Sequence, residues 1–118
     1  MLVAGDPWTV AVADDAAERA RGLSGVEDLG GLRGMLFVYP GDVTAGFWMK
    51  DTSIPLDIAF FAADGSLVDQ RSMVPCPADP CPVYAPGRPY RCALEVPAGG
   101  FAGLADLHLD PSPVEAGG

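Results

Sequence analysis

The chain has 118 residues, the length of one ordinary domain. Almost half of the residues are hydrophobic and only 19% are charged, which excludes an intrinsically disordered chain. The formal net charge is −9, and such a surface repels phosphate groups. We therefore expect neither nucleic acid nor an anionic membrane surface as a partner, and no stretch is apolar over the roughly 20 residues needed to span a bilayer.

The first third of the chain shows one strand pattern and one helix pattern. Apolar residues alternate with small or polar residues over 8–12, which predicts a half-buried strand. Asp15 is a suitable helix cap, and Glu18 follows three residues later as in a capping box. We expect a helix over 16–21 that stops at Gly22.

The rest of the chain reads mainly as strands joined by loops. Residues 23–33 are Gly-rich and irregular, and the prolines and cysteines of 75–89 predict a loop. Asp64-Gly65 is a turn signal that predicts a hairpin. The predicted strands are 34–39, 46–50, 56–61, 67–74, 91–96 and, at the end, 107–109.

Seven or so short strands predict a mainly β sandwich or barrel with one short N-terminal helix. We expect a single compact domain over residues 1–118, with its core between about 8 and 110 and a tail at 111–118. The strands do not alternate with helices, which argues against a doubly wound parallel sheet.

Residues 47–60 read FWMKDTSIPLDIAF, preceded by Arg21-Gly22-Leu23 and by GMLF at 34–37, and followed by Asp64-Gly65 and ALEV at 93–96. In order and spacing these blocks resemble the bacterial and archaeal family known as domain of unknown function 192, over nearly the whole chain. Ser24 and Asp51 depart from the Met and Asn that are usual there. The resemblance implies a compact, jelly-roll-like β domain, often behind a signal peptide in relatives, and implies no activity.

Asp57 is a carboxylate within an apolar strand, so it must be paired, hydrogen-bonded or protonated. We expect it to be largely buried and ionised, held by the bend at Thr52-Ser53 and by a cation, Arg21 first and Lys50 second. Glu95 has the same character, since it stands between Leu94 and Val96.

Lys50 is the single lysine of the chain and follows an aromatic segment. Strand alternation predicts that Phe47 and Met49 face the core. Trp48 and Lys50 then face a cleft or solvent, because burying the lysine would be costly.

Cys76 and Cys81 enclose a short Pro-rich loop, and a disulfide between them is geometrically feasible. Free thiols are the alternative, as is a zinc site formed with Cys92 and His108, although that spacing matches no compact zinc motif. We prefer the disulfide, with Cys92 unpaired, and expect no metal and no cofactor.

Three functions remain open. The first is a non-enzymatic module that binds a small molecule or a peptide near 47–57, with six candidate binding residues: Arg21, Trp48, Lys50, Thr52, Asp57 and Glu95. The second is a structural or interaction domain without a small ligand. The third is an enzyme that uses Asp57 and Glu95 as an acid–base pair. The N-terminus carries no signal-peptide pattern, so we expect a cytoplasmic protein or, as the alternative, an exported protein whose signal segment has been removed. We expect the protein to be a monomer or a weak homodimer.

Overall fold

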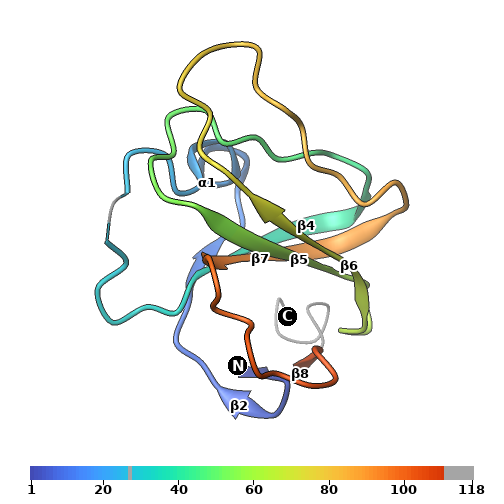
Figure 1. The fold of residues 1–118 in the computed structure, drawn as a ribbon. Helices are drawn as coiled ribbons and strands as arrows, with labels where there is room; N and C mark the ends of the chain where they lie inside the picture. The colour runs from blue at the N-terminus through green and yellow to red at the C-terminus, as the bar shows by residue number, and fades with distance from the viewer. Residues whose placement is uncertain (27, 111–118) are drawn as a thin grey trace.

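The structure, a computed structural model, describes residues 1–26 and 28–110, which form eight strands and one helix (Figure 1). The elements in chain order are β1 Leu2–Val3, β2 Asp6–Pro7, β3 Ala11–Ala13, α1 Ala16–Arg21, β4 Met35–Val43, β5 Leu56–Phe61, β6 Leu67–Met73, β7 Tyr90–Pro97 and β8 Leu109–Asp110. The mainly β prediction is thus confirmed. The predicted tail at 111–118 lies outside the described residues.

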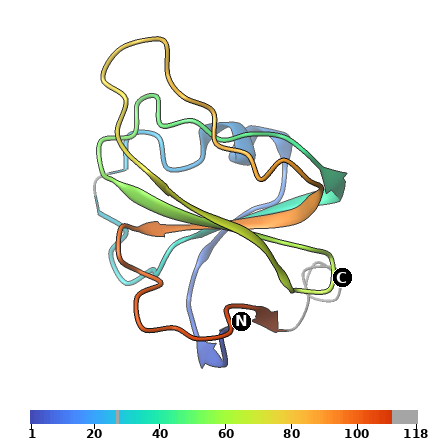
Figure 2. The ribbon, with the colours of Figure 1, turned by 45° about the vertical axis from the view of Figure 1, so that its right-hand side comes forward.

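The strands form two sheets. The larger has the order β3-β4-β7-β5-β6, and the smaller has the order β2-β1-β8. Within the larger sheet β3 and β4 are parallel, whereas the other neighbours are antiparallel. The larger sheet is a middle layer, with the small sheet on one side and α1 with the long loops on the other (Figure 2).

Each face of the larger sheet has its own core, and strand alternation in β5 separates them. Ala59 and Phe61 pack with the residues of the small sheet, whereas Leu56, Ile58 and Phe60 pack under the loops. All five side chains are at most 1% exposed. Burial of each large apolar side chain contributes about 1.5–3 kcal/mol, so β5 stabilises both cores.

Helix α1 begins and ends as its sequence predicts. The carboxylate of Asp15 accepts a hydrogen bond from the backbone N–H of Glu18, at 2.7 Å. The Glu18 side chain accepts in turn from the N–H of Asp14. At the other end Gly22 has a φ of 50°, which glycine adopts without strain, and the helix stops there.

The hairpin prediction is also confirmed, since β5 and β6 are antiparallel around the turn at Asp64-Gly65. Two strand predictions need correction. Residues 46–50 form only isolated bridges, from Phe47 to Tyr84 and from Lys50 to Cys76. The strand expected over 8–12 is regular only from residue 11, because Trp8 turns into the core near the small sheet.

Within the described part of the chain, no helix has the length and hydrophobicity needed to cross a membrane.

Candidate functional site

A cleft of about 380 Å³ opens where the Gly-rich segment after α1 meets the ends of β5 and β7. Its walls are mainly apolar and its charged lining group is Asp28, whose carboxylate accepts a hydrogen bond from the N–H of Gly30 at 2.8 Å. The lining residues are Asp28, Leu29, Gly30, Leu32, Ile54, Pro55, Pro97 and Ala98. The cleft therefore adjoins the Ile54-Pro55 bend of the 47–60 segment.

Backbone pairing holds the floor of this cleft in place. Leu56 of β5 pairs with Pro97 of β7, and the N–H of Ala98 donates to the carbonyl of Pro55 at 3.1 Å. Pro55 ends the preceding irregular segment, because its fixed φ favours an extended entry into the strand. Sequence reasoning missed the contribution of residues 28–32, because a Gly-rich segment without periodicity indicates no position in the fold.

Asp57 has a different environment from the one we expected. It is only partly exposed, but no ion pair joins it to Arg21 or Lys50 within the described residues. Its Oδ2 accepts a hydrogen bond from the backbone N–H of Gly99, at 3.0 Å. Gly99 has a φ of 88° in the turn after β7, so Asp57 stabilises that turn and not the Thr52 bend.

Glu95 is the deeply buried acid of this region. It is 4% exposed, and burial alone raises the pKa of its carboxyl from 4.5 to about 7. Its position explains the burial, because β7 is the central strand of the larger sheet and Glu95 pairs with Met35 on one side and Ile58 on the other. Such a carboxyl is about half ionised near pH 7 and becomes largely neutral only as the pH falls well below that value.

The strand register separates Asp57 from Glu95. Residues that are directly opposite in an antiparallel pair point to the same face of the sheet. Glu95 is opposite Ile58, and Asp57 is opposite Val96, so the two carboxyl groups point to opposite faces. They cannot reach one bound molecule together, and the proposed acid–base pair is wrong.

Trp48 and Lys50 lie on the outer surface, as alternation predicts. Met49 is 1% exposed and Trp48 is 54% exposed. The Nζ of Lys50 lies 5.4 Å from the centre of the Trp48 ring and 3.4 Å from Oδ2 of Asp79. Sequence reasoning missed Asp79, because its loop is distant in the chain.

Arg21 and Thr52 do not join these groups in one cleft. Arg21 is exposed at the end of α1, and Thr52 is buried, its N–H donating to the carbonyl of Met49 at 3.1 Å. Asp51, which precedes Thr52, has a φ of 60°, and its carbonyl accepts a hydrogen bond from the N–H of Gly25. Asn and Asp tolerate this left-handed conformation better than other non-glycine residues, so Asp51 suits this position.

The cysteines divide into a surface pair and a core residue. Cys76 and Cys81 form a disulfide with their Cα atoms 5.7 Å apart, and Cys92 is buried as a free thiol. Burial raises the pKa of the Cys92 thiol to about 12. Among residues 1–26 and 28–110, no group of three or more His, Cys, Asp or Glu side chains gathers as a metal site would require.

The fold and its cleft define a small, mainly β domain, and comparison with known proteins assigns its family. Residues 2–106 match the family model of domain of unknown function 192, described as "Uncharacterized ACR". The chain belongs to this family, and the sequence-based resemblance is confirmed. A search of curated proteins finds no match.

Two solved structures are similar to this chain. One, from Sinorhizobium meliloti 1021, is named as a candidate transcription regulator; it is 29% identical with a TM-score of 0.72, over 84% of this chain and 77% of that one. The other, a protein of unknown function from Novosphingobium aromaticivorans DSM 12444, is 33% identical with a TM-score of 0.69. That match covers 79% of this chain and 65% of the other.

Proposed function

We propose that this protein is a non-enzymatic binding module. Its ligand is a small aliphatic molecule with a positive charge, or a peptide end of the same chemistry, bound in the cleft beside Ile54 and Pro55. The observation that carries the proposal is the cleft itself. Its volume of about 380 Å³ is within the range of about 300–1,000 Å³ that is typical of small-ligand pockets.

The chemistry of the walls supports this ligand class. Leu29, Leu32 and Ile54 offer aliphatic contacts, and Asp28 supplies a carboxylate at the same cleft. The net charge of −9 favours the approach of a cation over that of an anion. An aliphatic body with an ammonium group satisfies both features.

Two other functions are less well supported. Catalysis by Asp57 with Glu95 would need both carboxyl groups on one face of the sheet, and their register places them on opposite faces. The name of the Sinorhizobium relative suggests a role in transcription. Direct contact with DNA is disfavoured for this chain, because its acidic composition repels the phosphate backbone.

Thermal unfolding with L-leucinamide, which combines an aliphatic side chain with an ammonium group, tests the proposal. Ligand that binds the folded state raises the unfolding midpoint by mass action, so leucinamide should raise it and the anionic N-acetyl-L-leucine should not. Ala98→Trp should abolish the effect by filling the cleft, since Ala98 is an exposed lining residue. Ala102→Trp is the matched control, because Ala102 is exposed outside the lining.

If leucinamide raises the midpoint of all three proteins equally, the cleft is not the site. If no tested cation or anion changes the midpoint of the native chain, an interaction domain without a small ligand is the better account.

A further inference from the structure

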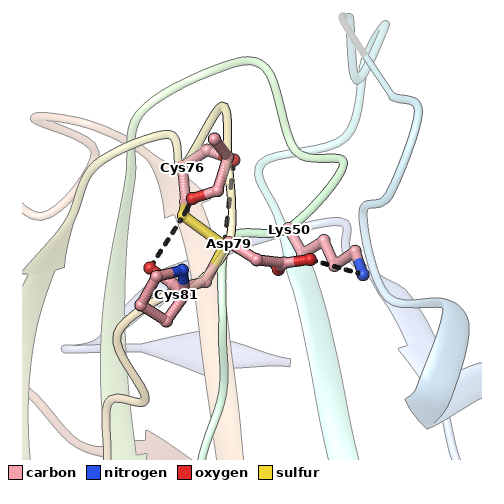
Figure 3. The surroundings of a disulfide bond; sticks show 6 residues. Lys50, Cys76, Asp79 and Cys81 are labelled. Carbon is pink, nitrogen blue, oxygen red and sulfur yellow. Dashed lines mark hydrogen bonds and ion pairs between the residues drawn. A yellow bond between two sulfur atoms is a disulfide. The ribbon is translucent and has the colours of Figure 1, made fainter.

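The loop closed by the disulfide lies between β6 and β7, and it contacts the exposed surface formed by Trp48 and Lys50, which we call the Trp48 surface. Cys76 forms a backbone bridge with Lys50, so the disulfide lies beside that lysine. Asp79 lies within the ring closed by the disulfide, with Oδ1 3.9 Å from Sγ of Cys81 and Oδ2 3.4 Å from Nζ of Lys50. Figure 3 shows the Asp79 side chain between the disulfide and Lys50.

The ion pair links the loop to an exposed aromatic group. Nζ of Lys50 lies near the ring of Trp48, and Val83 is 66% exposed on the neighbouring segment. Val83 also packs over Gly46, where a Cβ would collide with its side chain. Lys50 thus lies beside the exposed side chains of Trp48 and Val83, and its ion-pair partner is Asp79. The position of Asp79 determines whether the charge of Lys50 is paired.

Several features indicate that the disulfide can open and close without loss of the fold. Cys76 and Cys81 are both partly exposed and only five residues apart. Closing so short a ring removes little chain entropy from the unfolded state, so the disulfide adds only modestly to the stability of the fold. After reduction the Cys76 thiol can donate a hydrogen bond to the carbonyl oxygen of Ala78, which lies 3.3 Å from its Sγ.

We infer that Cys76 and Cys81 form a redox-responsive clasp that sets the pairing of Lys50 beside Trp48. In the oxidised state the closed ring holds Asp79 against Lys50. In the reduced state the loop relaxes, Asp79 leaves, and Lys50 presents an unpaired charge beside the indole. The clasp is closed in an oxidising compartment and open in a reducing cytoplasm.

The reductant is a low-molecular-weight thiol such as glutathione. Its thiolate attacks one sulfur of the pair to form a mixed disulfide, and the other cysteine leaves as a thiolate and takes up a proton. A second glutathione thiolate then attacks the glutathione sulfur, which releases oxidised glutathione and the second cysteine thiolate. Two electrons and two protons pass to the pair in total.

The first test equilibrates the full chain in glutathione buffers of different poise and then alkylates it under native conditions. Mass spectrometry should show no alkyl group in oxidising buffer and two in reducing buffer. Cys92 should react only after unfolding, because it is buried and burial raises its thiol pKa to about 12. A pair that stays closed in fully reduced glutathione, or a third alkyl group on the native chain, would overturn the proposal.

The second test follows the two indole N–H signals by NMR. Reduction should shift the Trp48 signal and leave that of the buried Trp8 in place. Asp79→Asn should shift the Trp48 signal in the oxidised protein and remove most of its response to reduction. Asp69→Asn is the control, because it breaks a different exposed ion pair, to Arg71. An unchanged Trp48 signal on reduction, or an Asp79→Asn variant that behaves like the control, would contradict the inference.

Discussion

Glu95→Gln is the substitution whose effect the structure defines most closely. Burial carries the pKa of the Glu95 carboxyl from 4.5 in the unfolded chain to about 7 in the folded one. At 1.36 kcal/mol per pH unit, this difference corresponds to about 3 kcal/mol. The folded state prefers the neutral acid, so ionisation costs stability. The cost is absent below pH 4.5, grows between pH 4.5 and 7, and is complete above pH 7.

Glutamine has nearly the same shape as glutamic acid and carries no charge at any pH. The variant therefore does not lose stability through ionisation at position 95. The free energy of unfolding, measured in urea from pH 4 to 8, should therefore rise in the variant relative to the native chain by about 3 kcal/mol over that interval. Tyr39, a neighbouring ionisable group whose pKa is raised by burial, stays neutral throughout. A constant difference between the two proteins, or one that falls with pH, would refute the burial argument.

Three further predictions concern packing and hydrogen bonding, and urea unfolding tests each of them. Met49→Ala should lower the free energy of unfolding by about 2–5 kcal/mol, because it leaves a cavity in the core. Trp48→Ala should lower it by at least about 1 kcal/mol less. The reverse order would contradict the assignment of the two side chains to their faces. Asp57→Asn should cost no more than about 1 kcal/mol, because the amide oxygen can still accept the same backbone hydrogen bond, and a larger loss would indicate an ionic partner. Gly34→Ala should lower the free energy of unfolding by about 2 kcal/mol or more, since the new Cβ would collide with the backbone of β7. Gly41→Ala is the control and should have little effect, because the space around Gly41 is open. Equal losses of stability in the two variants would count against the close approach at Gly34.

Much of the fold could be predicted because it depends on local signals. The helix follows from Asp15, Glu18 and Gly22, and the hairpin follows from Asp64-Gly65. The two faces of β5 follow from period-two alternation alone. Each of these features is determined by residues close together in the chain.

The site could be predicted only in part, because it depends on long-range register. Asp57 and Glu95 look alike in sequence, yet one supports an exposed turn and the other lies in the central strand. Nothing local to either residue reveals that they point to opposite faces. The pairing of Lys50 with Asp79 is of the same kind, since it depends on how a loop folds back over 29 positions.

Binding of an aliphatic cation in the cleft beside Ile54 and Pro55 can be observed residue by residue in solution. The experiment is a titration of ¹⁵N-labelled protein with L-leucinamide, followed by the backbone amide signals. We predict saturable shifts centred on Leu29, Gly30 and Ala98, absent in Ala98→Trp and weaker in Asp28→Asn. Shifts that centre on the Trp48 surface instead, or that persist unchanged in Ala98→Trp, would contradict the account.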